Sequence, residues 1–121
     1  MSAKRFVHSF YDAIRGLKFT FIHEQNFRIQ ILLAVAVLLI AWLLPLKSWE
    51  IILIILLIIS VVVMELLNTA FEYFIDLLKP RLHHYVLIVK DIMAAAVLIT
   101  SLGAAIIGTL IFWPYFMNLL K

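Results

Sequence analysis

Residues 51–64 carry no charged side chain, and a segment rich in carboxylates, residues 65–76, follows them directly. A soluble domain is typically about 45–50% apolar and about 25% charged. In this chain 66% of the 121 residues are hydrophobic and 14% are charged. The uncharged run therefore indicates a helix within a bilayer, and the chain is predicted to be a single integral-membrane domain.

Residues 31–46 and the stretch that follows Asp91 are also apolar. A helix of about 20 apolar residues crosses a bilayer core of about 30 Å. We therefore predict an all-α fold with three transmembrane helices, at about 28–46, 49–78 and 85–116. Small residues that favour close helix packing lie in the third of these: Gly103, Ala104, Ala105 and Gly108.

Residues 4–24 mix polar and apolar side chains with a helical period. Apolar residues recur every three or four positions, at Phe6, Phe10, Ile14, Leu17 and Phe21. This pattern predicts an amphipathic helix on the membrane surface, with its aromatic side toward the lipid. A helix packed against protein would show the same pattern, and both descriptions hold if the helix borders a bundle.

The basic residues are unevenly distributed among the predicted connections. They are frequent before the first span and between the second and third spans, whereas Lys47 is the one basic residue between the first and second. The positive-inside rule then places the N-terminus and residues 79–91 in the cytoplasm. Residues 1–25 lack the uncharged core of a cleavable signal peptide. We therefore expect a multi-pass protein of the cytoplasmic membrane.

Polar side chains follow residue 64 at helical spacing. They fall at offsets 0, 3, 4, 7 and 11 and so share one face of a helix: Glu65, Asn68, Thr69, Glu72 and Asp76. We call this set the polar stripe. Ionisable groups at membrane depth are costly and usually mark function. Since Glu65 and Glu72 would lie about 10.5 Å apart along the helix, the deeper acid could meet a lipid headgroup while the outer acid meets a cytoplasmic ligand.

Glu24, the polar stripe, Lys90 and Asp91 are all expected where the helices reach the cytoplasm. Oxygen ligands suit Mg²⁺, a lysine suits a phosphate, and a carboxylate at membrane depth could take a proton from a lipid hydroxyl. These groups favour phosphoryl transfer to a lipid. The chain has no G-x-x-x-x-G-K-[ST] loop and no cysteine. The chemistry alone therefore leaves transport, a small channel and a structural role open.

Each candidate also has an ordinary explanation. Glu24, Glu72 and Asp76 could be solvated charges near helix ends, and Lys90 could extend its ammonium group to the interface. Glu65 could serve an inter-helix hydrogen bond. A permeation path needs polar groups throughout the bilayer, and the first span offers almost none, which argues against transport.

Several short sequence motifs can be recognised along the chain. The polar stripe reads E-L-L-N-T-A-F-E over residues 65–72, a K-D pair stands at 90–91 with A-A-V-L at 95–98, and R-G-L and E-x-N-F-R stand at 15–17 and 24–28. In these motifs the sequence resembles the bacterial diacylglycerol kinase family of small membrane lipid kinases, which includes the undecaprenol kinases. The resemblance covers the whole chain.

The resemblance implies a homotrimer whose protomers have a surface helix and three spans and share active sites that use Mg-ATP. It implies that Glu65 is the general base for the lipid hydroxyl, and that Glu24 and Glu72 hold the metal on ATP. Further positions implied to contact ATP are Arg5, Asp12, His83, Lys90 and Asp91. Those implied to orient the site or to lie near the lipid are Arg15, Asn68 and Ala94.

Two departures from the family pattern concern the substrates. Arg81 and Leu82 stand where some members have an acidic–aromatic pair, and Met93 and Ala94 stand where some have Gly-Ser. We expect an ATP-dependent lipid kinase whose acceptor, diacylglycerol or undecaprenol, the sequence leaves open. The rival hypothesis is a non-enzymatic membrane transporter or assembly protein.

Overall fold

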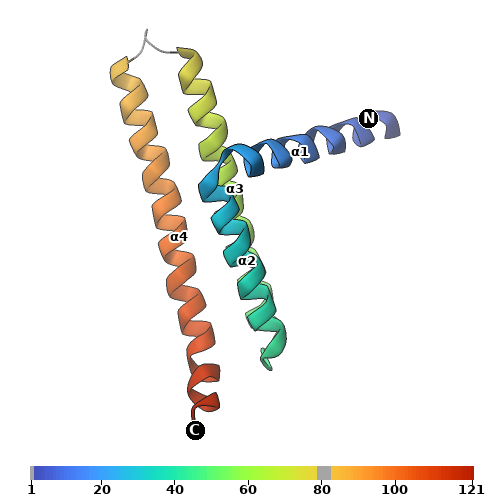
Figure 1. Cartoon of the computed structure of the whole chain (residues 1–121), viewed down its shortest axis with the longest axis vertical. Coiled ribbons are helices and arrows are strands. Elements are labelled where there is room, and N and C mark those ends of the chain that lie inside the picture. The colour runs from blue at the N-terminus through green and yellow to red at the C-terminus, as the bar shows by residue number, and fades with distance from the viewer. Residues whose placement is uncertain (1, 79–82) are drawn as a thin grey trace.

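The computed structural model describes residues 2–78 and 83–121, which form four helices. Their bounds are Ala3–His23 for α1, Gln25–Leu43 for α2, Ser48–Leu78 for α3 and His83–Leu119 for α4. Figure 1 shows α2, α3 and α4 extending along a common direction, while α1 crosses that direction and projects away from the other helices. The predicted all-α fold is confirmed.

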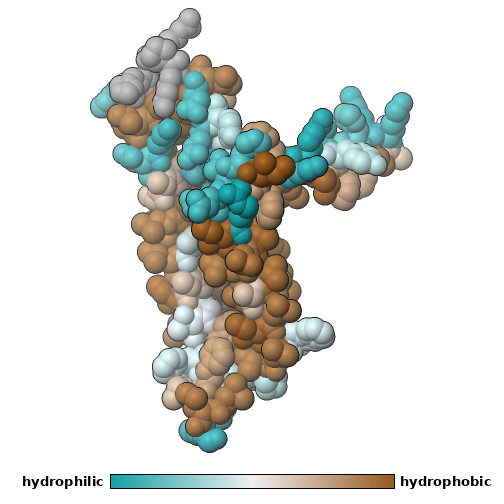
Figure 2. All heavy atoms as spheres, viewed as in Figure 1, coloured by the Kyte–Doolittle hydropathy of each residue, from teal (hydrophilic) through white to brown (hydrophobic). Residues whose placement is uncertain are grey.

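Three segments are long and apolar enough to cross a membrane: Gln25–Leu43, Ser48–Leu78 and His84–Leu119. Many of their large apolar side chains are exposed, as in Trp42, which is 83% exposed. Figure 2 shows hydrophobic surface over the body of the bundle and hydrophilic residues on α1 and where α1 joins the bundle. An apolar surface this extensive suits contact with lipid, so the protein is a membrane protein.

The chain changes direction at Glu24, between α1 and α2. The backbone of Glu24 is extended (φ −114°, ψ 111°), and its N–H donates to the Thr20 carbonyl at 2.8 Å. Arg28 reaches back from α2, and its Nη1 donates to the carbonyls of Phe21 and Ile22 at 2.8 Å each. Carbonyls in the last turn of a helix have no partner within that helix. Arg28 therefore caps α1 and fixes the corner that positions Glu24.

The apolar core lies at the end of the bundle away from α1, where Ala41, Ile54 and Ile111 are buried together. Glu50 is buried nearby, and its Oε1 accepts hydrogen bonds from the Tyr115 hydroxyl and from the Lys47 N–H. These bonds join the connection between α2 and α3 to α4. They hold this end of the bundle together with polar contacts as well as apolar ones.

Two of the small residues of α4, Gly103 and Gly108, have open space beside them in the described part of the single chain. A Cβ added to Gly103 or Gly108 would meet nothing within 4 Å. Ala104, Ala105 and Gly108 instead line a hollow of about 490 Å³ between α2, α3 and α4, which Gln30 also lines. We call it the central hollow. Gly103 and Gly108 therefore do not pack closely on another helix among the described residues of the single chain, and for Ala104 and Ala105 close packing stays a prediction. Helix α4 also begins and ends slightly beyond the predicted 85–116.

Candidate active site

Glu65 lies in the interior of α3, and it is only 3% exposed. Its Oε2 accepts a hydrogen bond from Nε2 of Gln30, on α2, at 3.1 Å. A buried carboxylate is costly unless it is hydrogen-bonded, so Gln30 stabilises Glu65 at this depth. The pair joins α2 to α3 within two helical turns of the corner at Glu24.

The remaining members of the polar stripe become more exposed along α3. Thr69 is buried, and its hydroxyl donates to the Glu65 carbonyl at 3.0 Å. Asn68 and Glu72 are half-buried, with Asn68 Nδ2 3.4 Å from Glu72 Oε1. Asp76 is exposed. The stripe therefore extends from a buried acid at Glu65 to an exposed acid at Asp76.

Glu24 approaches the stripe from the corner between α1 and α2. It is partly exposed, and its side chain makes no capping hydrogen bond to α2. Both Glu24 and Glu72 lie near enough to Glu65 for their carboxylate charges to interact with it. Three acids from different parts of the sequence therefore gather where the apolar bundle meets its hydrophilic end.

Lys90 and Asp91 lie on α4, which packs against α3. Lys90 is partly exposed and Asp91 is exposed. Within residues 2–78 and 83–121, no hydrogen bond or ion pair joins either residue to Glu65, Asn68 or Glu72. The single chain thus places Lys90 and Asp91 on a neighbouring helix without connecting them to the stripe.

Two further candidates, His83 and Ala94, belong to α4. Ala94 is exposed. His83 begins the helix, and its side chain lies outside the described part of the chain, as do Arg81 and Leu82. The expected nucleotide contact of His83 therefore stays a prediction.

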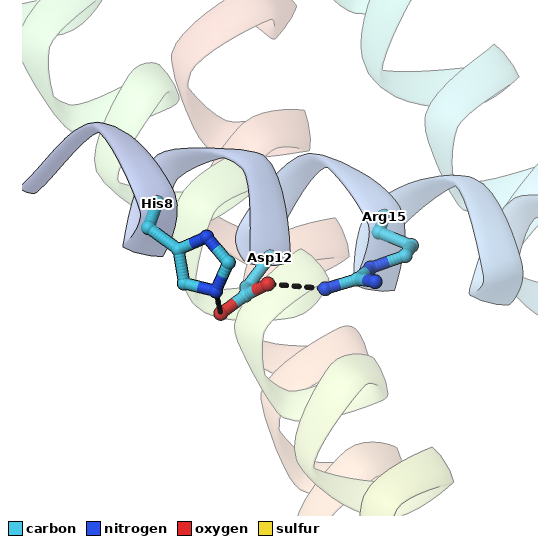
Figure 3. A network of polar contacts seen from close by, with 3 residues as sticks. All are labelled: His8, Asp12 and Arg15. Atoms are coloured by element: carbon cyan, nitrogen blue, oxygen red, sulfur yellow. Dashed lines mark hydrogen bonds and ion pairs between the residues drawn. The ribbon is translucent and has the colours of Figure 1, made fainter. Parts of the chain in front are cut away.

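The candidates Arg5, Asp12 and Arg15 lie on the exposed face of α1. Asp12 pairs with Arg15, and His8 Nε2 lies 3.9 Å from the Asp12 carboxylate (Figure 3). At about 1.5 Å per residue, Arg5 is about 28 Å from Glu24 along the helix. One chain therefore does not bring Arg5 to the three gathered acids.

Comparison with known proteins covers most of the chain. Residues 11–112 match the family described as prokaryotic diacylglycerol kinase. The chain belongs to this family. Undecaprenol kinase of Bacillus subtilis is 40% identical over 110 residues, which span 91% of this chain and 89% of that protein. Diacylglycerol kinase of a Synechocystis species is 35% identical over 113 residues, which span 93% of this chain and 65% of that protein.

Membership of the prokaryotic diacylglycerol kinase family makes the chain a lipid kinase and favours an enzyme over a transporter. Mg²⁺ in kinase sites is typically held by one or two carboxylates together with substrate phosphates. Glu24 and Glu72 fit that requirement. Among the described residues, no group of three or more His, Cys, Asp or Glu side chains could hold a metal alone. The donor set therefore fits a metal that arrives with the nucleotide.

Sequence reasoning missed Gln30, the partner of Glu65. It treated residues 27–30 as an extension of the first span. The one local signal is that Gln30 follows the buried Phe27 by three positions and so shares the inward face of α2. Glu65 lies 35 positions further along the chain, on another helix. The contact therefore depends on how α2 packs on α3, which local sequence does not reveal.

Proposed function

We propose that this member of the family transfers the γ-phosphoryl group of ATP to the hydroxyl of a membrane lipid, diacylglycerol or undecaprenol. The products are phosphatidic acid or undecaprenyl phosphate. The observation that carries the proposal is the buried Glu65 carboxylate, held by Gln30 and flanked by two further acids. A buried acid of this kind, in a chain from a lipid kinase family, suits a base that acts at membrane depth.

Glu65 is the general base in this proposal. Its carboxylate takes the proton of the lipid hydroxyl while the lipid oxygen forms a bond to the γ-phosphorus. The bond between that phosphorus and the β–γ bridging oxygen breaks, and ADP leaves. A base positioned in this way typically contributes about 10²–10⁴-fold to the rate.

Glu24 and Glu72 bind the metal that accompanies ATP. Bound Mg²⁺ would offset charge on the phosphate oxygens. Asn68 contacts Glu72 at 3.4 Å and so helps to orient its carboxylate. Lys90 supplies a positive charge for the phosphates. In this arrangement the nucleotide binds at the hydrophilic end of the bundle, and the hydroxyl of the lipid substrate binds next to the Glu65 carboxylate.

The central hollow supports a lipid acceptor. It begins at Gln30, beside Glu65, and it is lined mainly by apolar side chains such as Leu33, Val37 and Ile58. A lipid hydroxyl presented to Glu65 could therefore keep its hydrocarbon chain among apolar groups. Its volume of about 490 Å³ lies within the range of about 300–1,000 Å³ typical of small-molecule sites.

We also propose a homotrimer in which neighbouring protomers complete each site, with the N-terminus in the cytoplasm. Helix α1 projects from its own bundle (Figure 1), and Arg5 and Asp12 lie far from their own Glu65. Phe6 and Phe10 are 66% and 61% exposed, which suits a surface helix at the interface. Mixing inactive Arg5→Ala and Glu65→Gln chains should restore part of the activity, because some mixed sites contain both native side chains.

Purified protein incubated with labelled ATP, Mg²⁺ and either lipid tests the proposed function. We expect at least one lipid to become labelled, and the two separate incubations identify the acceptor. Omitting Mg²⁺ should abolish labelling, and Glu65→Gln provides the control for activity from contaminating kinases. If folded wild-type protein labels neither lipid, the proposed reaction is wrong.

A further inference from the structure

Gln30 contacts Glu65, the candidate base, through the nitrogen of its side-chain amide. Nε2 donates to Glu65 at 3.1 Å, whereas Oε1 is buried and has no hydrogen-bond partner in the part of the chain that the structure describes. Buried polar atoms in native proteins nearly always have a partner, and an exception often has a functional cause. Here the exception lies on the side chain that already binds Glu65.

The unused acceptor matches a change that Glu65 undergoes during the reaction. An ionised carboxylate can only accept hydrogen bonds, but a protonated one carries an O–H that needs an acceptor. The primary amide of Gln30 offers an N–H donor at one end and a carbonyl acceptor at the other. The terminal torsion of a glutamine is broad and roughly two-fold. A half turn about it therefore exchanges donor for acceptor without moving the backbone.

The other groups near Glu65 are charged acids or make their hydrogen bonds to atoms other than the Glu65 carboxylate. Glu72 on α3 and Glu24 at the corner are negatively charged neighbours. The Thr69 hydroxyl donates to the Glu65 backbone carbonyl, and the Asn68 amide contacts Glu72. From α4, no described residue makes a hydrogen bond or ion pair with Glu65. Gln30 is therefore the neighbour suited to both protonation states.

We propose that Gln30 is the positioning residue of the general base. Its N–H holds the ionised Glu65 carboxylate for the lipid hydroxyl, and its carbonyl accepts the O–H of Glu65 once the proton has moved. The O–H bond of the lipid breaks, the O–H bond of Glu65 forms, and Gln30 exchanges only a hydrogen bond. This inference rests on the proposed function, because it requires Glu65 to take a proton.

Gln30→Leu and Gln30→Glu test the role of Gln30, because each removes different hydrogen-bonding groups of the side chain. Gln30→Leu removes donor and acceptor with little change in size, and Gln30→Glu removes the N–H while keeping the shape. We expect each to lower kcat by about tenfold or more while KM for ATP and for lipid stays within about twofold. Because the N–H favours the ionised base, its loss should move the acidic limb of the pH–kcat profile to higher pH. The added negative charge should move it furthest in Gln30→Glu.

Thr100→Val is the matched control. Thr100 lies outside the lining of the central hollow, and its hydroxyl donates to the carbonyl of Ala96 in its own helix at 2.8 Å, so kcat and the pH profile should stay at the wild-type values. Thermal unfolding identifies any variant that does not fold. If Gln30→Leu does not fold, the kcat and pH profile of Gln30→Glu test the role of Gln30. If a folded Gln30 variant keeps the wild-type kcat and the wild-type acidic limb, the proposed role of Gln30 is wrong, but the proposed function of the protein still stands. An inactive wild type would overturn the proposed function and this inference together.

Discussion

Helix α3 carries two buried glutamates, Glu50 near its start and Glu65 about 22 Å further along. They are 7% and 3% exposed, so burial does not distinguish them. Their hydrogen bonds do. Glu50 Oε1 accepts from both the Tyr115 hydroxyl and the Lys47 N–H. Within residues 2–78 and 83–121, Glu65 has one side-chain partner, Gln30, whose carbonyl oxygen accepts no hydrogen bond there.

The position of Glu50 explains its bonds without any catalytic role. It lies in the first turn of α3, where an acid is stabilised by the partial positive charge of the helix end. Its bond to the N–H of Lys47, just before the helix, is the acidic half of a capping box. Glu65 lies in the interior of α3, where no such helix-end effect applies. The comparison indicates that Glu50 closes one end of the bundle, and it supports the proposed catalytic role of Glu65 at the other.

The largest expected effect is on turnover, at Glu65. Glu65→Gln keeps the shape and can still bond to Gln30, but it removes the base, so kcat should fall about 10²-fold or more. Thermal stability in detergent should be at least as high as in the wild type, because a buried charge is replaced by a neutral amide. If folded Glu65→Gln keeps a kcat close to wild type, Glu65 is not the general base. Glu65 would then, like Glu50, have no catalytic role.

Glu50→Ala should show the opposite pattern. It removes the acceptor of the Tyr115 hydroxyl and of the Lys47 N–H, so the free energy of unfolding should fall. The kcat of the folded enzyme should stay within about twofold of wild type, since the change lies far from the three gathered acids. Unfolding in detergent and turnover at a permissive temperature give the two values. A fall in kcat like that of Glu65→Gln, with stability unchanged, would contradict the division between the two ends.

Tyr115→Phe should have a smaller effect of the same kind. It removes one donor to Glu50 and leaves the Lys47 N–H in place, so the expected loss of stability is smaller than for Glu50→Ala. Since Tyr115 and Glu50 share the bond, their effects should not add. The doubly substituted protein is therefore expected to be little less stable than Glu50→Ala. Strictly additive losses would show that the two residues act separately.

The parts of this molecule that were predictable from sequence depend on local pattern. Helical periodicity and uncharged runs predict the four helices, and the helical spacing of the polar stripe places Glu65 and Glu72 on one face. The family resemblance singled out Glu65, and the matched family confirms that resemblance. These features need no knowledge of how the helices pack.

The parts that were not predictable depend on packing between helices. Gln30 meets Glu65 only because α2 packs on α3, and the small residues of α4 line a hollow because α2 and α4 flank α3 there. The expected group of Lys90 with the stripe stays a prediction for the same reason: sequence places these residues on adjacent helices, but it does not fix their separation. Contacts between the protomers of the proposed homotrimer would depend even less on local sequence pattern.

The smallest expected effect is in the middle of α3, between the two acids. Ser60 is exposed, and its hydroxyl donates to the carbonyl of Leu56 within the same helix at 2.8 Å. Ser60→Ala should change the free energy of unfolding by no more than about 0.5 kcal/mol, because a lost bond to the backbone is offset by the higher helix propensity of alanine. Its kcat should equal that of the wild type. These two measurements set the baseline for the other variants of α3. A several-fold change in kcat would mean that polar groups along the whole helix contribute to turnover, and the contrast between Glu50 and Glu65 would then no longer separate a structural end from a catalytic one.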